Sequence, residues 1–215
     1  MTNNNPTSWW WIRHAPVTSN EGRIYGQTDL PGDCSEEACF AGLARLLPEG
    51  ARWITSTLRR TRDTAEAVLS HRGGETGEME ALPAFVEQHF GEWQGLRYDE
   101  LTTVAGPEGH RFWLAPAEVR PKGGESFVDL LARVQPAIRS KSLSHRGEDL
   151  IVFAHGGTIR AALALALGIA PERALGFSID NCSLTRIQHW PEGETGPEAW
   201  RVVTVNLDPR AYAQA

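Results

Sequence analysis

The chain has 215 residues, of which 41% are hydrophobic and 22% are charged. This balance is typical of a globular protein and excludes a chain that is disordered throughout. The net charge of −6 disfavours a nucleic-acid interface, which needs a basic footprint, and no apolar run reaches the ~18 residues of a membrane span. Cys34, Cys39 and Cys182 form no CxxC pair, so neither a disulfide framework nor a zinc knuckle is predicted. We therefore expect a soluble, reduced, cytoplasmic protein that binds neither nucleic acid nor membrane.

The first part of the chain predicts two strands that alternate with two helices. Residues 1–8 (MTNNNPTS) read as a loose tail, and the fully apolar run Trp9–Ile12 is typical of a strand buried on both faces. Apolar residues at helical spacing predict a helix over 38–47. A second strand over Ala51–Thr55 and a second helix over Leu58–Ser70 follow.

The rest of the chain is irregular at first and then returns to the same alternation. Residues 83–122 read as an irregular insertion, with short helical stretches near Tyr98–Val104 and Glu108–Leu114. The elements predicted after it are a helix from Gly123 onward that Pro136 bends or shortens, a strand over Leu150–Ala154, a helix over Ile159–Leu167, and strands over Ser183–Trp190 and Trp200–Val205. This order predicts an α/β protein, a three-layer α/β/α sandwich with a mainly parallel central sheet, formed by a single domain over 1–215.

Two of the predicted strands end in a histidine. His14 comes directly after Arg13 at the end of the first strand, and His155 follows strand 150–154 and precedes Gly156 and Gly157. Ligands of open α/β sheets bind beyond the carboxyl ends of the strands, so both imidazoles are expected at one site. Two glycines at a helix start leave backbone N–H groups open to an anion. A lone histidine at a strand end is more often structural, but this pair favours an anion-binding site.

A basic segment, Ser56 to Ala65 (STLRRTRDTA), follows the second strand. Solvent exposure at a helix start is the simplest explanation for two of its three arginines. Cations at a helix N-terminus oppose the helix macrodipole. One of the arginines is therefore a candidate for holding an anion in the site.

Four segments, taken in chain order, match the motifs of one family. They are Arg13-His14-Ala15 with Asn20 and Gly22-Arg23 downstream, the second segment at Ser56, Leu58, Arg60, Thr64 and Ala65, Glu87 to Gly95 (EQHFGEWQG), and His155-Gly156-Gly157. In this order they resemble the histidine phosphatase (phosphoglycerate mutase-like) superfamily. Each motif alone is weak, but the ordered set is specific. The resemblance implies the phosphoglycerate mutase-like fold.

The chain departs from the family pattern at three places. Ala15 replaces the usual glycine, Tyr25 stands where many members have glutamine, and the spacing from Asn20 to Gly22 is one residue shorter than the common form. Within the superfamily, the chain is similar to bacterial phosphatases near the α-ribazole phosphatase branch of cobalamin biosynthesis in four segments: Arg13–Val17, Tyr25–Asp29, Phe90–Trp93 and Gly124–Phe127.

The resemblance implies hydrolysis of a small phosphorylated metabolite through a phosphohistidine, with no metal and no other cofactor. His14 Nε2 is then the nucleophile, with its Nδ1–H fixed by a backbone carbonyl. Arg13, Arg60 and His155 bind the phosphoryl oxygens, Glu87 protonates the leaving alkoxide, and the insertion lies over this site. The further candidates for phosphate or substrate binding are Asn20, Tyr25, Gly26 and Gly156.

Two other functions stay open from the sequence. One is phosphoryl transfer of the phosphoglycerate mutase type, and the other is a phospho-ligand binding module without catalysis. Hydrolysis is favoured because the acid segment reads Phe-Gly-Glu-Trp rather than the mutase form. The presence of His14, Arg60, Glu87 and His155 together argues against the binding module. The identity of the phosphomonoester, and whether the chain is a monomer or a homodimer, are not decided by the sequence.

Several residues near the motifs receive no role from the sequence. They are Arg23, His89, Trp93, Arg120, Lys122 and Asn181. Exposure or packing is the simpler explanation for most of them, whereas Asn181 is a candidate for contact with the site from a late strand. The other histidines are expected to be mostly exposed: His71, His110, His145 and His189.

Overall fold

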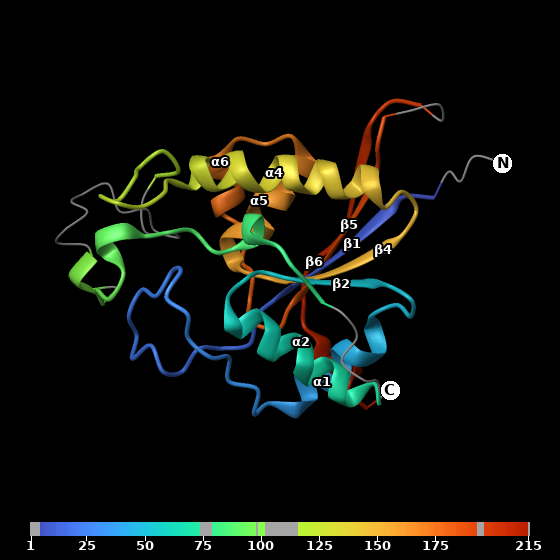
Figure 1. Ribbon diagram of the computed structural model, residues 1–215, viewed down its shortest axis with the longest axis horizontal. Helices are drawn as coiled ribbons and strands as arrows, with labels where there is room; N and C mark the ends of the chain where they lie inside the picture. The colour runs from blue at the N-terminus through green and yellow to red at the C-terminus, as the bar shows by residue number, and fades with distance from the viewer. Residues whose placement is uncertain (1–4, 74–78, 98, 102–115, 193–195, 215) are drawn as a thin grey trace.

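The computed structural model describes residues 5–73, 79–97, 99–101, 116–192 and 196–214. Within them, six strands form one sheet in the order β3-β2-β4-β1-β5-β6 (Figure 1). The strands are β1 (Thr7–Arg13), β2 (Arg52–Thr55), β3 (Glu80–Ala81), β4 (Asp149–Ala154), β5 (Leu184–Trp190) and β6 (Ala199–Leu207). β1 to β4 pair in parallel, while β5 runs antiparallel to both β1 and β6.

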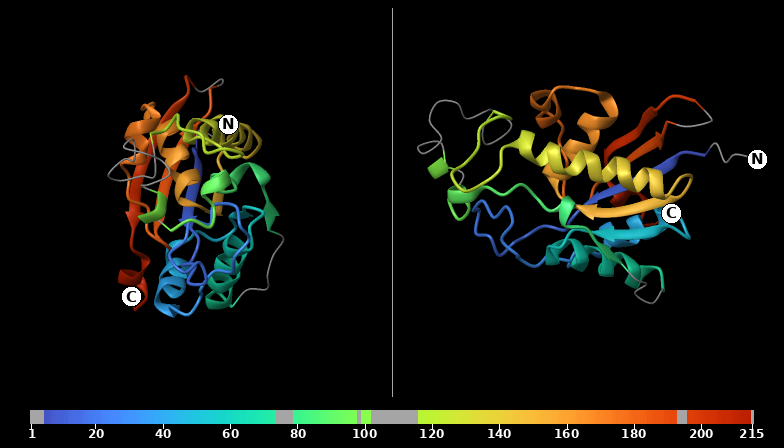
Figure 2. Two further views of the ribbon diagram at one scale, coloured as in Figure 1. Left: turned by 90° about the vertical axis from the view of Figure 1, so that its left-hand side faces the viewer. Right: turned by 45° about the horizontal axis from the view of Figure 1, so that its top comes forward.

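Helices cover both faces of this sheet (Figures 1 and 2). α1 (Glu37–Leu46) and α2 (Arg59–His71) lie on one face, and α4 (Phe127–Ser144), α5 (Gly156–Leu167) and α6 (Pro171–Leu175) lie on the other. The described chain also forms short 3-10 helices, named η1 (Pro83–Phe85), η2 (Gly91–Trp93) and η4 (Pro209–Tyr212). The predicted α/β fold with a mainly parallel sheet is confirmed. In the part of the chain that is described, no helix is both long enough and apolar enough to cross a membrane.

The apolar strands supply both halves of the core because successive side chains point to opposite faces of the sheet. In β1, Trp9 and Trp11 belong to the core under α4 and α5, whereas Ile12 belongs to the core under α1 and α2. The two indole rings stack with centroids 5.2 Å apart, and the Phe85 ring from η1 packs edge-on against both. This packing fixes η1 just before the segment that carries the predicted acid.

The pairing of β1 with β4 brings the two histidine-bearing strand ends together. Arg13 pairs with Ala154, and the His14 N–H then donates to the Ala154 carbonyl at 3.0 Å. On the other side of β4, the Ser56 N–H donates to the Phe153 carbonyl at 3.3 Å. Three of the four sequence motifs therefore lie at the carboxyl ends of three adjacent strands, β2, β4 and β1.

Two boundaries differ from the sequence predictions. Thr7 and Ser8 are buried members of β1, so the predicted tail of residues 1–8 is two residues too long. Their polar groups are satisfied by ladder pairing and by hydrogen bonds such as that from Thr7 Oγ1 to the His145 carbonyl, which composition does not reveal. α4 also runs past Pro136 for two further turns, so the proline does not shorten it, because a continuous buried apolar face holds the helix together.

Among the described residues, His71 is exposed as expected, but the expectation is wrong for His189, which is 1% exposed, and His145 is only partly exposed. The His189 ring stacks on Trp200 with centroids 3.6 Å apart, and its Nε2 lies 3.0 Å from Glu198 Oε1. The predicted helical stretches at 98–104 and 108–114 lie mostly outside the described residues, as does His110, although residues 99–101 are helical.

Candidate active site

His14 and His155 lie side by side beyond the carboxyl ends of β1 and β4, with ring centroids 5.1 Å apart. Both side chains are almost fully buried. Burial and the guanidinium groups of Arg13 and Arg60 hold the pKa of His14 well below its usual value. Burial, Arg60 and the neighbouring His14 lower the pKa of His155 in the same way. Both imidazoles are therefore neutral near pH 7.

The hydrogen bonds of His14 decide which of its ring nitrogens is unprotonated. Nδ1 lies 2.6 Å from the Ala15 carbonyl oxygen. Since a carbonyl only accepts, Nδ1 carries the proton and Nε2 keeps its lone pair. Asn181 Nδ2 donates to the His14 carbonyl at 2.8 Å, which holds the backbone of the histidine in place. The predicted bond to a backbone carbonyl is thus present, and Asn181 makes the contact for which it was a candidate.

Two guanidinium groups are held next to the histidine pair by backbone carbonyls. Arg60, on the first turn of α2, is 0% exposed and donates to the carbonyls of Gly26 at 2.6 Å and Thr28 at 2.9 Å. Arg13 donates from Nη1 to the Ile179 carbonyl at 2.6 Å. These contacts fix the arginines but use only some of the five N–H groups of each.

Three buried polar atoms of this cluster have no hydrogen-bond partner among the described residues. They are Nε of Arg13, Nε of Arg60 and Nδ1 of His155. A buried polar group without a hydrogen-bond partner destabilises the folded state by ~1–3 kcal/mol. Three such groups in one cluster therefore destabilise it substantially. An oxyanion would accept from the two guanidinium groups, and from His155 in its Nδ1–H tautomer.

The second motif holds the backbone next to His14 and the ring of His155. The Thr64 hydroxyl donates to the Arg60 carbonyl at 2.6 Å and accepts from the Ala15 N–H at 2.8 Å. Ser56 Oγ lies 2.8 Å from His155 Nε2. Ser56 therefore contacts His155, Thr64 holds the residue after His14, and Arg60 places its positive charge near both histidines.

Glu87 reaches the site from the segment after η1. Its Oε1 accepts from the Gly157 N–H at 3.2 Å and from the Gln88 N–H at 3.0 Å. A β-carbon on Gly157 would lie 2.4 Å from Glu87 Oε1, so glycine is needed for this close approach. The carboxylate thus lies at the N-terminus of α5, where the helix dipole favours negative charge, two residues from His155.

Tyr25 and Gly26 join the site from the loop after β1. The Tyr25 ring centroid is 6.4 Å from that of His14, and the Arg60 guanidinium lies over the Tyr25 ring at 5.0 Å. Gly26 has a φ of +43°, and a β-carbon there would lie 2.5 Å from Gln94 Oε1. Both residues therefore shape the surroundings of Arg60.

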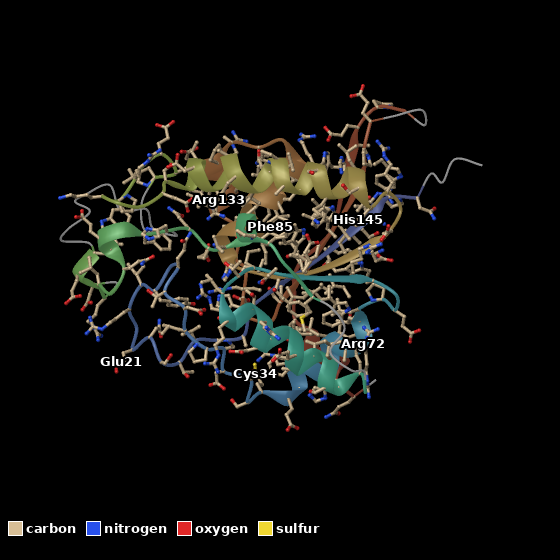
Figure 3. All side chains as sticks on the ribbon, viewed as in Figure 1. Glu21, Cys34, Arg72, Phe85, Arg133 and His145 are labelled. Carbon is tan, nitrogen blue, oxygen red and sulfur yellow. The ribbon has the colours of Figure 1, made fainter. Side chains whose placement is uncertain are left out.

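Asn20, predicted to bind the phosphate, lies farther out in the same loop. Its Nδ2 donates to the Arg23 carbonyl, and the Arg23 N–H donates to the Asn20 carbonyl, both at 2.9 Å, which closes a local turn. Figure 3 shows the neighbouring Glu21 at the outer edge of this loop. Within the described part of the chain, Asn20 makes no hydrogen bond to the histidines or arginines of the site. The phosphate contact of Asn20 stays a prediction.

Arg160 is a buried cation at the site that the sequence analysis did not single out. It lies on α5, five residues after His155, and is 9% exposed. Burial lowers its pKa to about 10. A β-carbon on Gly156 would lie 3.1 Å from Arg160 Nη1 and 3.8 Å from Arg13 Nε, so the two arginines flank Gly156. The sequence signal that could have identified Arg160 is a single charged residue in the first turns of an otherwise apolar helix.

The other residues without a role lie outside the histidine cluster. Arg23 and Lys122 are exposed, Arg120 pairs with Asp129, His89 Nδ1 accepts from the Gly91 N–H, and Trp93 packs with Ile24, Phe90 and Leu101. Among the residues that the structure describes, no three His, Cys, Asp or Glu side chains are arranged to hold a metal ion.

The family model of the histidine phosphatase superfamily (branch 1) matches residues 9–207. The chain belongs to this superfamily. The match includes all four motifs and every strand from β2 to β6, so the predicted family is confirmed together with the fold.

Relatives in this superfamily include both phosphatases and mutases. A glucosyl-3-phosphoglycerate phosphatase from Mycolicibacterium vanbaalenii is 32% identical over 217 residues, covering 94% of this chain and 88% of its own. A 2,3-bisphosphoglycerate-dependent phosphoglycerate mutase 2 from Gloeobacter violaceus is 32% identical over 194 residues, covering 85% of each chain. The solved structure of a mycobacterial glucosyl-3-phosphoglycerate phosphatase complexed with VO3 has a TM-score of 0.76 at 26% identity, covering 94% of this chain and 99% of that one.

A putative alpha-ribazole-5'-P phosphatase from Escherichia coli has a TM-score of 0.72 at 21% identity, covering 94% of this chain and 98% of that one. At this identity the likeness shows the shared fold alone.

The neutral, buried histidines predict that stability falls at acid pH. The pKa of each is lower in the folded chain than its ordinary value of 6.5, so the unfolded state binds protons first as the pH falls. Stability is therefore complete above about pH 6.5 and is lost below it, by up to about 1.4 kcal/mol per pH unit for each histidine. Thermal unfolding followed between about pH 7.5 and pH 5 measures this loss.

His14→Gln and His155→Gln should each flatten the dependence of Tm on pH over that range. His71→Gln, which removes an exposed histidine of α2, is the matched control and should keep the wild-type slope. Equal slopes in the wild type and in both buried-site variants would contradict the assignment of neutral imidazoles.

Proposed function

We propose that this chain hydrolyses small phosphomonoesters through a phosphohistidine formed on His14, without a metal ion. The observation that carries the proposal is the state of the His14 ring: it is neutral, its Nδ1–H is bound to the Ala15 carbonyl, and its Nε2 is unprotonated. A phosphomonoester is a dianion that repels anionic nucleophiles. A neutral imidazole avoids this repulsion and still offers a lone pair to phosphorus.

The charge around His14 supports binding of a dianion. Arg13, Arg60 and Arg160 bring three guanidinium groups, and among the described residues Glu87 and Asp29 are the carboxylates whose charges act on Arg60. The unpartnered Nε–H groups of Arg13 and Arg60 are preorganised donors for phosphoryl oxygens. Phosphoryl transfer depends chiefly on positioning and on stabilising charge in the transition state, so these groups supply what the reaction needs.

Glu87 is proposed as the group that moves the proton. It would protonate the leaving alkoxide while His14 Nε2 bonds to phosphorus, and would then accept a proton from the water that attacks the phosphohistidine. Its attachment to the Gly157 N–H places the carboxylate beside the second histidine motif. The same group serves both half-reactions because the alkoxide leaves, and the water enters, on the side of phosphorus opposite to His14.

Mutase activity is the second candidate function, because one of the similar proteins is a phosphoglycerate mutase. Both activities share the transfer to His14 and differ in whether water or a phosphoglycerate takes the phosphoryl group. We favour water because the acid segment, Phe90–Trp93, reads Phe-Gly-Glu-Trp rather than the mutase form. Glucosyl-3-phosphoglycerate and α-ribazole phosphate are the first esters to test, since they correspond to the names of similar proteins.

Hydrolysis in excess EDTA tests the proposal. A panel of p-nitrophenyl phosphate, glucosyl-3-phosphoglycerate, α-ribazole phosphate, phosphoglycerates, sugar phosphates and nucleoside monophosphates should show phosphate release that the chelator leaves unchanged. Quenched reactions with a labelled substrate should leave the label on the protein in an acid-labile, alkali-stable form, and His14→Asn should abolish it. Loss of activity with EDTA, or an unlabelled wild-type protein during turnover, would contradict the mechanism. Faster transfer to a phosphoglycerate than to water would establish the mutase alternative.

Glu87→Gln tests the proton-transfer role. On an alkyl phosphate, whose leaving group needs a proton, kcat should fall by roughly 10²- to 10⁴-fold. On p-nitrophenyl phosphate, whose leaving group needs little help, the loss should be much smaller, and phosphate should still bind. Glu92→Gln, which changes an exposed carboxylate of the same segment, is the matched control. Near wild-type kcat on the alkyl phosphate would rule out the role.

A further inference from the structure

The partly buried ion pair between Arg133 and Glu125 lies outside the histidine cluster and has no part in the proposed hydrolysis. Arg133, on α4, and Glu125, just before α4, are 23% and 24% exposed. Nε of Arg133 lies 2.8 Å from Glu125 Oε1, and Nη2 lies 3.0 Å from Glu125 Oε2, so the ion pair is bidentate. Glu125 belongs to the Gly124–Phe127 segment that resembles one branch of the family.

We propose that Arg133, held by Glu125, is a positioning residue that fixes the backbone beneath Glu87 and so sets where the Glu87 carboxylate meets the leaving group. This inference rests on the proposed acid role of Glu87. Arg133 does not touch the reacting atoms in this scheme. Its effect passes through the main chain of the segment after η1.

The remaining N–H groups of Arg133 donate hydrogen bonds to the segment that carries Glu87. Nη1 donates to the carbonyls of Ala84 at 2.9 Å and Val86 at 3.0 Å, and Nη2 donates to the Glu87 carbonyl at 3.0 Å. With the two bonds to Glu125, these contacts engage all five N–H groups of the guanidinium. Figure 3 shows Arg133 on α4 above the segment that contains Phe85. Three carbonyls of an irregular stretch thus find donors that no regular secondary structure would give them.

Glu125 fastens the same segment on the far side of Glu87. Its Oε2 accepts from the His89 N–H at 3.0 Å, its own N–H donates to the His89 carbonyl at 2.7 Å, and its carbonyl accepts from Gln88 Nε2 at 2.8 Å. Burial raises the pKa of Glu125, but the hydrogen bonds from Arg133 and from the His89 N–H outweigh burial and hold that pKa below its usual value. Glu125 is therefore ionised at neutral pH and keeps its contact with Arg133.

The two ends of Glu87 are thus held by different helices. Its carboxylate is bound at the N-terminus of α5 through the Gly157 N–H, and its main chain is bound by Arg133 of α4. A displacement of about 1 Å at a catalytic group is enough to cost roughly 10²-fold in rate. Lysine keeps the charge but offers three donors from a single nitrogen, so it cannot replace the guanidinium fork.

Arg133→Lys and Glu125→Gln test the proposal with two substrates. Each variant should lower kcat on an alkyl phosphate by roughly 10- to 100-fold, with KM little changed, while kcat on p-nitrophenyl phosphate and labelling of His14 stay within a few-fold of wild type. Arg139→Gln is the matched control, because Arg139 also lies on α4 and pairs with a carboxylate, Glu198, away from the site. An equal loss on both substrates would show a merely structural role and overturn the proposal.

The Glu87→Gln background separates this inference from the proposed function. If Arg133 acts through Glu87, Arg133→Lys should change kcat by less than about 2-fold once Glu87 has been replaced. A full, independent loss in the double variant would overturn the positioning role while leaving the acid role intact. A Glu87→Gln variant with wild-type activity would instead overturn the acid role itself. Should Arg133→Lys fail to fold, Glu125→Gln is read by the same criteria, since it leaves the guanidinium in place.

Discussion

The hydrogen bond between His14 Nδ1 and the Ala15 carbonyl is the contact on which the site depends. It fixes the tautomer of a ring that burial and two nearby cations keep neutral. The bond is possible because the backbone around it is held at three points: by Ala154 of β4, by Asn181, and by Thr64 of α2. The sheet register, a late loop and a helix thus converge on the orientation of one side chain.

The arrangement of the site lowers the stability of the folded chain, and an anion bound there would restore part of it. Three polar atoms of Arg13, Arg60 and His155 are buried without a partner in the described structure, and burial beside the arginines disfavours the protonated form of His14. A fold selected for stability alone would pair these groups or replace them with apolar ones. The phosphoryl ligand of the proposed function would account for their presence around an unprotonated Nε2, because its negative charge suits these donors.

The sequence predicted the fold well because the features that decide it are local. Apolar runs such as Trp9–Ile12 mark buried strands, and the alternation of strands with helices leaves few arrangements of a parallel sheet. The sequence also placed His14, Arg60, Glu87 and His155 in one site, and the structure brings them together. It misjudged Thr7 and Ser8 because their burial depends on partners more than 130 positions away in the chain.

Contacts that patterns in the sequence do not reveal account for the rest. The direction of the Asn20 side chain is set by a local turn, which spacing along the chain does not reveal. His189 is buried because Trp200, on the neighbouring strand, covers its ring. Arg160 and Arg133 acquire their surroundings only when α5 and α4 meet the segments around residues 13 and 84–87. Spacing and composition therefore do not predict the surroundings of a side chain that a local turn or another segment determines.

The state of the His14 ring is open to direct measurement by NMR of its nitrogens. In protein labelled with ¹⁵N, correlations between ring nitrogens and carbon-bound protons distinguish protonated from unprotonated nitrogens, and a His14→Gln sample identifies the signals. We predict a neutral ring with a proton on Nδ1 and none on Nε2, from about pH 7.5 down to at least pH 6. A doubly protonated ring, or one that carries its proton on Nε2, would contradict the account.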